Sequence, residues 1–329
     1  MLLPCQNWQT FSRRSVRPMS EDQKMSNQLE FWEKPEAKEI YMLAGWRQWA
    51  DAGSISSALP EYLIERNDAR PIGEIKPTDF YMFQIPGTHH FLRPVVKLKN
   101  GRRQKLEVRK NEFYYTGDQD KGLVIFLGDE PHMNVELYAE AFFAAAKQLG
   151  VKRIGAVGGV YGSMPYDKER EVSCVFSLKH MKKELDDYAL RFSNYEGGAT
   201  IGSYLLDRAE QEGMEYVVMY AFVPAYDFDG SAAMPNGIRI ENDYKAWYDI
   251  MRRFNHMFGM NLDLSHLRER SDELINFMDA KMTELEQEAP SLKIQEYLAQ
   301  LDEQFTEHHF APLGDVWEQG LADLFGDEE

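Results

Sequence analysis

Three side chains that could carry chemistry stand close together in the segment "GDEPH" (128–132). Asp129 and Glu130 supply two carboxylates, and His132 supplies an imidazole that titrates near neutral pH. Such groups could bind a divalent metal or act as general acid and base. Because two acids and a histidine also occur together by chance at strand ends, we predict no metal and no cofactor at this segment.

A second cluster, "GWRQWADAG" (45–53), combines Trp46 and Trp49 with Asp51 and Gly53. A tryptophan in a loop could stack on a ligand, and the aspartate could bind that ligand or transfer a proton. The alternative is structural: the tryptophans cover the edge of a sheet, and Asp51 caps the next helix. The sequence leaves both interpretations open.

Glu112 is a further candidate for binding or proton transfer. The turn "YEGGATIG" (195–202) places Tyr195, Gly197 and Gly198 at the expected start of a helix. Free amides at a helix N-terminus can bind an anion. Ordinary capping explains the same turn without any ligand, so this site also has two interpretations.

The motifs of the common phosphate-binding and nucleophilic sites do not occur in the sequence. A P-loop and a dinucleotide fingerprint require glycines at fixed spacing, which "GAVGGVYG" (155–162) does not provide. A nucleophile elbow requires a flanking glycine pattern that Ser163 lacks. The sequence therefore contains no recognisable phosphate-binding motif and no recognisable motif for a catalytic nucleophile.

Cysteines and histidines add little chemistry. Cys5 and Cys174 are the two cysteines, which excludes a disulfide framework and fits a reducing cytoplasm. Cys174 has no reactive signature around it, so we expect it to pack in the core or under a loop. The histidine pairs at 89–90 and 308–309 are expected to be surface residues and not ligands.

The charge balance excludes one class of partner. A net charge of −17 argues against nucleic acid, whose phosphates require clustered Lys and Arg. Much of this charge is local, because residues 261–329 contain 18 acidic and 4 basic residues, a net charge of −14. That acidity fits solvated helix faces or an acidic docking surface. No run approaches 18 apolar residues, so no membrane-spanning helix is expected.

Strand-like and helix-like segments alternate through the first two-thirds of the chain. Strands are predicted at 39–45, 69–75, 122–128, 151–160 and 214–223, and helices at 54–66, 135–149 and 198–213. Pro60 inside the first helix is a local conflict, because proline removes a helical hydrogen bond. Alternation of this kind implies parallel strands joined by right-handed crossovers. We therefore predict a three-layer α/β/α sandwich with a mostly parallel sheet.

Residues 94–108 carry the clearest local signal, two alternating runs on either side of Asn100-Gly101. That dipeptide tolerates the positive φ angles of a type I′ turn, so we predict a projecting β-hairpin. The hairpin holds most of a basic cluster between Arg93 and Lys110. It could contact an acidic C-terminal helix in the same or a neighbouring subunit, or its tip could simply be solvated.

Beyond about residue 238, apolar residues recur at helical spacing in three narrow stripes. Such stripes are typical of helices that pack on a core or on another subunit. The predicted organisation is a disordered N-terminal tail (1–28), an α/β core domain (29–237), a C-terminal helical appendage (238–310) and an acidic C-terminal tail (311–329).

Several of these segments together resemble the proteasome assembly chaperone 2-like family, which is widespread in bacteria and archaea. The matching segments are "GWRQWADAG" (45–53), "ALPEYL" (58–63), "DFYMFQ" (79–84), "RPVVKL" (93–98), "NEFYY" (111–115), "LGDEPH" (127–132), "YAEAFFAAAKQLGVKRIGAVGGV" (138–160), "YEGGATIG" (195–202) and "AFVPAY" (221–226). Each segment is modest alone, but in this order they are specific, and they cover about residues 39–300.

The resemblance implies a phosphorylase/hydrolase-like three-layer α/β core with helices added at the C-terminal end, in agreement with the pattern described above. It implies that bacterial members form homo-oligomers, often trimers. Members resemble nucleoside phosphorylases in fold but lack an assigned catalytic set. The family is also associated with ATP-dependent ligases of the ATP-grasp kind, for which this sequence contains no nucleotide loop.

Two departures limit what the resemblance implies. Family members often read Tyr, small residue, Gly, Pro, Thr, Gly where this chain has "YEGGAT" (195–200), so the proline is lost and a glycine is shifted. Archaeal relatives dock on proteasome rings through a C-terminal hydrophobic-tyrosine-any tripeptide, whereas this sequence ends Asp327-Glu328-Glu329. Chaperoning of a proteasome by that route is therefore not implied here.

Two functions fit these observations. The first is a non-enzymatic interaction or assembly protein that acts as a homo-oligomer, such as a trimer, and contacts an unidentified protein partner. The second is a small-molecule-binding protein or an enzyme, of the ATP-dependent ligase or hydrolase type, that uses a cleft at the strand ends. In that case Trp46 could stack on a ligand, and Asp51, Glu112 or Glu130 could bind it or transfer protons. We favour the first function and keep the second as the alternative.

Overall fold

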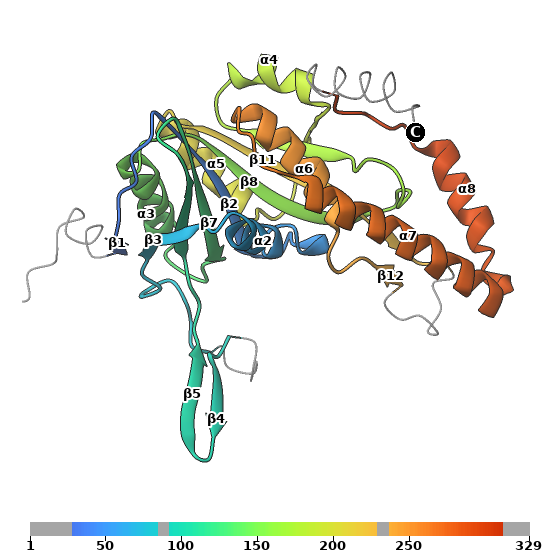
Figure 1. Cartoon of the computed structure of the whole chain (residues 1–329), viewed down its shortest axis with the longest axis horizontal. Helices are drawn as coiled ribbons and strands as arrows, with labels where there is room; N and C mark the ends of the chain where they lie inside the picture. Colours follow the sequence, from blue (N-terminus) through green and yellow to red (C-terminus); the bar gives the residue numbers. More distant parts are fainter. Residues whose placement is uncertain (1–27, 85–91, 229–236, 312–329) are drawn as a thin grey trace, which may run out of the picture.

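The computed structural model describes residues 28–84, 92–228 and 237–311 of the chain (Figure 1). Cys5 and the histidine pair at 89–90 lie outside these ranges, as do the two predicted tails except for one residue of each. The C-terminal histidine pair lies inside them, and its exposed side chains confirm the expected surface position.

Ten strands of the described chain form one mixed sheet. They are β1 (Leu29–Phe31), β2 (Glu39–Arg47), β3 (Arg70–Ile75), β6 (Glu112–Gly117), β7 (Lys121–Asp129), β8 (Val151–Gly162), β9 (Val172–Phe176), β10 (Arg191–Phe192), β11 (Glu215–Tyr226) and β12 (Ile238–Arg239). The strand order is β1-β3-β6-β7-β2-β8-β11-β9-β10, and β12 pairs with β11. The central strands β7, β2, β8 and β11 run parallel. On one side β6 is antiparallel to β7 and β3, and on the other β9 is antiparallel to β11 but parallel to β10.

The helices lie on both faces of this sheet (Figure 1). They are α2 (Ala58–Arg66), α3 (Val135–Gln148), α4 (Met181–Leu185), α5 (Ile201–Gln211), α6 (Tyr244–Met257), α7 (Ser265–Glu288) and α8 (Ile294–Gln304), with short 3₁₀ turns η1 (Ala52–Ser54), η2 (Asp186–Tyr188) and η3 (Pro290–Leu292). Helices α3 and α5 cover one face, and α2 and α6 cover the other. The predicted three-layer sandwich is therefore confirmed.

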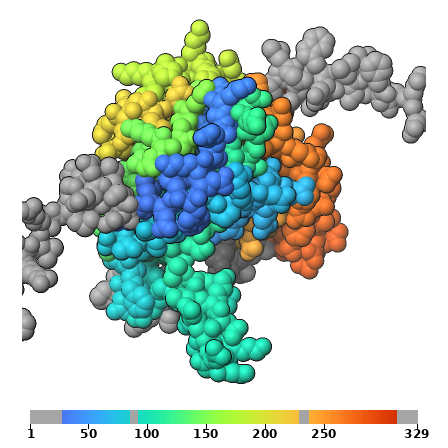
Figure 2. All heavy atoms as spheres, turned by 60° about the vertical axis from the view of Figure 1, so that its left-hand side comes forward, coloured from blue at the N-terminus to red at the C-terminus, as the bar shows by residue number. Residues whose placement is uncertain are grey.

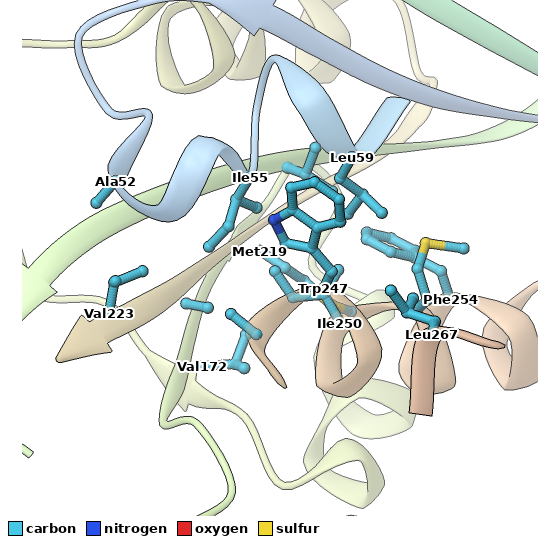
Figure 3. Close-up of a cluster of buried hydrophobic side chains, with 14 of the residues drawn as sticks. Ala52, Ile55, Leu59, Val172, Met219, Val223, Trp247, Ile250, Phe254 and Leu267 are labelled. Atoms are coloured by element: carbon cyan, nitrogen blue, oxygen red, sulfur yellow. The ribbon is translucent and has the colours of Figure 1, made fainter. Parts of the chain in front are cut away.

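Burial on both faces explains why the central strands are parallel. Strand β7 is buried from its second residue to its last, as a strand covered by helices on both sides requires. On the α3 side, Phe142 packs against Phe126 of β7. On the other side, Trp247 and Phe254 of α6 lie among buried side chains that include Met219 of β11 (Figure 3). Two apolar layers therefore hold the sheet between them.

The conflict raised by Pro60 disappears in the structure. Helix α2 begins at Ala58, so Pro60 lies in the first turn, where backbone N–H groups have no partner within the helix. Its ring packs on Gly45 of β2, where an added Cβ would lie 2.6 Å from Pro60 Cγ and 2.1 Å from the Ser56 carbonyl oxygen. The helix predicted at 54–66 is thus shorter, because a 3₁₀ turn and a bend precede it.

The predicted hairpin is confirmed. It consists of β4 (Val95–Lys99) and β5 (Arg102–Glu107), which pair only with each other. Asn100 and Gly101 both have positive φ, +49° and +77°, as a type I′ turn requires. Figures 1 and 2 show the hairpin projecting away from the body of the molecule.

Two buried ion pairs connect α6 to the segment before β9. Arg170 and Asp243 have no exposed side-chain surface and are 2.9 Å apart, and Asp243 also accepts the Ala246 N–H at the start of α6. Arg253 lies 2.9 Å from Glu169 and is equally buried. Helix α6 is thus part of the packed core, while the division of the chain into separate domains stays a prediction.

Helices α7 and α8 lie outside α6, on the right of Figure 1, whereas the hairpin projects downward from the body. Helix α7 is the longest helix of the described ranges and is rich in charged residues. Within those ranges, no helix is both long enough and apolar enough to cross a membrane.

Candidate functional site

A cleft of about 690 Å³ opens at the carboxyl ends of β8 and β11, beside the loop that follows β2. This is the edge of an α/β sheet where ligands commonly bind. Three aromatic side chains stand at the cleft with much of their surface in solvent: Trp49 is 72% exposed, Tyr195 67% and Tyr161 44%.

The remaining lining of the cleft is uncharged. Its polar groups are hydroxyls from Ser173, Ser193, Thr200, Ser203 and Tyr220, and in the part of the chain that the structure describes no acidic, basic or histidine side chain lines it. Burial raises the pKa of Tyr220, so its hydroxyl remains protonated at neutral pH. The cleft therefore suits apolar and neutral hydrogen-bonding groups better than it suits an ion.

The start of α5 closes one side of the cleft, and the N–H groups of Thr200, Ile201 and Ser203 there already have partners. The Thr200 side chain accepts the Ser203 N–H, and the Ser203 hydroxyl accepts the Thr200 N–H. The Glu130 carboxylate accepts the Ile201 N–H at 2.9 Å. The Glu130 carboxylate thus takes the position at the start of α5 where an anion could bind. Capping explains the turn at residues 195–202 without a ligand.

The loop after β2 separates its two tryptophans. Trp46 is fully buried between Phe126 and Phe142, and its indole N–H donates to the Tyr138 hydroxyl at 2.9 Å. Trp49 lies in the cleft next to Gly198. Only the second tryptophan is therefore placed to contact a ligand or partner.

Asp51 and Gly53 have structural roles in the same loop. The Asp51 carboxylate accepts the N–H groups of Ser56 and Ser57 at 2.7 and 3.0 Å, immediately before α2. Burial raises the pKa of Asp51 against the effect of these bonds. Gly53 has φ +64°, and its carbonyl accepts the Trp247 indole N–H at 2.9 Å. Asp51 thus holds the turn that leads into α2, whereas the N-cap residue of that helix is Ser57.

The residues of "GDEPH" do not converge on one point. Asp129 is buried and pairs with Arg109 at 3.0 Å, while Glu130 turns to α5. His132 accepts the Met82 N–H through Nδ1, and burial, followed by the charge of Arg109, lowers its pKa. Among the residues that the structure places, no three potential metal ligands come together.

Glu112 lies away from the cleft, on β6. Its carboxylate contacts Lys110 at 2.7 Å and the Tyr114 hydroxyl at 2.9 Å. These residues border a separate hollow of about 290 Å³ that also contains Arg47. A third hollow, of about 520 Å³, lies at the amino end of β8, where Lys152 pairs with Glu39. Neither hollow shares a residue with the cleft.

Tyr195, Gly197 and Gly198 form one wall of the cleft. The Tyr195 ring folds back over Gly197, where an added Cβ would lie 2.2 Å from the phenolic oxygen. Glycine is therefore required for this position of the ring. Cys174, by contrast, is buried in the core as expected, and burial raises its pKa to about 12, so its thiol is unreactive.

Sequence reasoning missed Tyr161, Tyr220 and Phe222, which the structure adds to the cleft. A signal exists for Tyr161, which is the penultimate residue of β8 and so lies at the edge of the sheet where the loops converge. Tyr220 and Phe222 lie near the middle of β11, where strand position gives no such signal.

Comparison with protein families decides the identity of this fold. The model of the PAC2 family matches residues 46–282, which is most of the described chain. The chain belongs to the PAC2 family. No curated protein matches it significantly.

Solved structures related to this PAC2 protein share its fold. A PAC2 family protein from Streptomyces avermitilis is 24% identical with a TM-score of 0.62, and the alignment covers 74% of this chain and 95% of that one. A proteasome-assembly chaperone homologue from Mycobacterium tuberculosis is 20% identical with a TM-score of 0.62, covering 73% and 94%. An archaeal proteasome activator from Pyrococcus furiosus is 20% identical with a TM-score of 0.53, covering 77% and 97%.

Proposed function

We propose that this PAC2 protein is a non-enzymatic interaction or assembly protein that acts as a homo-oligomer and contacts a protein partner through the cleft. The observation that carries the proposal is the composition of the cleft. Exposed aromatic side chains, led by Trp49 and Tyr195, surround a lining of hydroxyl groups. Aromatic residues of this kind are the most frequent energetic anchors of protein interfaces.

The positions of the acidic side chains support a contact role over a catalytic one. General acid–base catalysis requires a titratable group within hydrogen-bond reach of the substrate. Asp51 is held by backbone amides before α2, Glu130 by the start of α5, and Asp129 by Arg109. Each carboxylate thus stabilises a local structure, and none of the three lines the cleft.

The relatives add support of a different kind. Two structural neighbours carry the names proteasome-assembly chaperone homologue and archaeal proteasome activator, and both names describe action through contact with other proteins. A chaperone-like role for the present chain agrees with its PAC2 membership. The identity of the partner is a separate question from the mode of action proposed here.

Sedimentation equilibrium of the full chain tests the proposed homo-oligomer. The subunit mass is 38.2 kDa, and we expect a multiple of that mass at micromolar concentration. A monomer at every concentration and ionic strength would contradict the proposal. The exposed aromatic side chains of the cleft would then need an explanation that does not involve an oligomer.

A small-molecule ligand is the alternative that a specific observation favours. The cleft volume of about 690 Å³ lies in the range of roughly 300–1,000 Å³ found for ligand sites. Its lining would suit a neutral ring that stacks on Trp49 and hydrogen-bonds to hydroxyls. Such a ligand would raise the melting temperature of the wild-type protein and have no effect on a Trp49→Ala variant.

A further inference from the structure

The hairpin carries a charge opposite in sign to that of the whole chain. Residues 95–107 contain five basic side chains and one acidic side chain, a net charge of +4, whereas the whole chain has −17. The basic residues are Lys97, Lys99, Arg102, Arg103 and Lys105. The hairpin is therefore a positive arm on a negative molecule.

The two faces of the hairpin differ. The strand register places Val96 opposite Leu106, with Leu98 on the same face, and these side chains are 51%, 45% and 63% exposed. The other face is charged, since Lys97 and Lys105 both pair with Glu107 at 3.0 and 3.1 Å. One face is thus apolar and the other basic.

An isolated two-stranded ribbon with an exposed apolar face is a marginal structure in water. Strands β4 and β5 pair with no other described strand, and Figure 2 shows the arm standing free of the body. A contiguous apolar face of this kind on a projecting element is typical of an interaction surface. The chemistry of the arm calls for a receptor that is acidic and has an apolar centre.

The outer helices of the same chain meet that description. Residues 265–304 contain ten acidic and four basic side chains, a net charge of −6. On α7, Phe277 is 63% exposed, with Glu273 one turn before it and Lys281 one turn after it on the same side of the helix. The acidity of this surface therefore comes from the segment 265–304 as a whole. Outside the hairpin and the cleft, the other large exposed apolar side chains of the described chain are Trp32, Phe83, Val108 and Met133. Of these five, Phe277 alone lies in the acidic segment 265–304.

The acidic groups around Phe277 are accessible. Glu273 and Glu284 are more than half exposed, and each has only one neighbouring base, Arg270 or Lys281 respectively. Exposed pairs of this type contribute little and can exchange partners. The surface therefore remains available to a positive arm.

Within one chain the arm cannot reach this surface. Figure 1 shows the hairpin and α7 projecting from different parts of the body, well separated in the view. A contact between them thus requires two copies of the chain. Such a contact can repeat reciprocally in a two-fold dimer or run from copy to copy around a ring.

We propose that the β4–β5 hairpin of one copy docks on α7 of a second copy, with its apolar face on Phe277. Arg103, which is paired with Leu98 across the hairpin, meets the acidic groups beside Phe277. The lysines of the opposite face steer the approach through long-range attraction, which salt weakens. This interface rests on the homo-oligomer proposed above and specifies how it forms.

Two variants, one on each side of the contact, test the interface. The hairpin variant carries Leu98→Glu and Arg103→Glu, and the helix variant carries Phe277→Lys and Glu273→Lys. All four side chains are exposed, so the melting temperature of each variant should remain close to that of the wild type. A matched control, Trp32→Glu with Lys34→Glu, makes the same kind of change on the far edge of the sheet.

Sedimentation velocity at low salt measures the result. We expect each variant alone to dissociate with at least a tenfold weaker self-association constant, while the control keeps the wild-type size. An equimolar mixture should form a one-to-one complex, because an intact α7 on the hairpin variant can still accept the intact hairpin of the helix variant. An oligomer whose interface uses neither the hairpin nor α7 does not predict this rescue on mixing.

Three outcomes would overturn the interface. Either variant keeping the wild-type size shows that the oligomer uses another face. Two monomeric variants that fail to combine show that hairpin and α7 do not meet. The third outcome combines two results: the wild-type protein binds vesicles containing phosphatidylserine and the hairpin variant does not, while the helix variant keeps the wild-type size. These results would assign the hairpin to a lipid surface. A monomeric wild type would instead remove the proposed homo-oligomer itself.

Discussion

Trp46 and Trp49 lie three residues apart and occupy opposite environments. Trp46 has no exposed surface and donates its indole hydrogen to Tyr138, whereas Trp49 is 72% exposed at the cleft. We expect Trp46→Ala to lower the free energy of unfolding by about 3–5 kcal/mol through loss of packing. Trp49→Ala should change it by no more than about 0.5 kcal/mol.

Urea unfolding of the two variants provides the measurement. A large loss of stability for Trp49→Ala would show that this ring is part of the fold and not a contact residue. A small loss for Trp46→Ala would show that its buried position is wrong. The two results are independent, since Trp46 packs on Phe126 and Phe142 in the core, whereas Trp49 lines the cleft.

His132 gives the fold a dependence on pH. Burial lowers its pKa below the ordinary value of 6.5, so the folded state binds this proton less readily than the unfolded state does. The neutral ring is fully compatible with the fold above pH 6.5, and stability is lost as the pH falls from 6.5 toward the lower folded pKa. His132→Asn removes the titration but retains an acceptor for the Met82 N–H.

Unfolding midpoints in urea at pH 7 and pH 5 check this effect. We expect the wild-type midpoint to fall more between these values than the midpoint of His132→Asn. Parallel changes in both proteins would show that other groups control the acid sensitivity.

At the scale of single residues, the sequence identified the important loops better than the important side chains. Alternation along β2 could have placed Trp46 in the core, because Met42 and Ala44 precede it on the same buried face. No comparable rule directs the side chains that follow a strand. Asp129, Glu130 and His132 are sequence neighbours, yet each forms its bonds with a different element.

At the scale of elements, continuous apolar runs were sufficient to predict the buried strands. Strands β7, β8 and β11 are long, and their patterns are distinctive. Strands β1, β9 and β10 have two to five residues, too few for a pattern to emerge. Strand β6 alternates between buried and half-buried positions over only six residues, and it was recognised only as a family segment.

The ion pair of Arg170 with Asp243 is an element-scale feature that no sequence pattern signals, because the partners are 73 residues apart. Asp243→Ala would leave a guanidinium group buried without its counter-ion and remove the cap of α6. Loss of one partner of a buried pair typically costs about 3–5 kcal/mol. We expect a decrease of that size in the free energy of unfolding.

The matched variant is Asp243→Asn, which keeps an acceptor for the Ala246 N–H but loses the charge and the acceptor for Arg170 Nε. Its loss of stability should be smaller than that of Asp243→Ala. Equal urea midpoints for the wild type and Asp243→Ala would contradict the role of the buried pair in holding α6 on the sheet.

At the scale of the whole molecule, the order of the elements predicted the layers, but not the composition of the cleft. The cleft depends on which loops meet at the sheet edge, and it joins Trp49, Tyr161 and Tyr195 from distant parts of the chain. The uneven charge was visible in composition alone. Its consequence for assembly required the position of the hairpin relative to α7 (Figure 1).

At the same scale, we propose that this PAC2 protein acts by contacting other proteins and does not catalyse a reaction on a small molecule. A thermal-shift series on the full wild-type chain tests this most directly, with nucleosides, nucleotides and ATP with magnesium as the ligands. A ligand present at 100 times its Kd adds about 2.7 kcal/mol to stability, which raises the Tm of a protein of this size by roughly 4 °C. We predict shifts below about 1 °C for every compound. A shift of several degrees with ATP and magnesium that is lost in Trp49→Ala would contradict the account and establish the cleft as a ligand site.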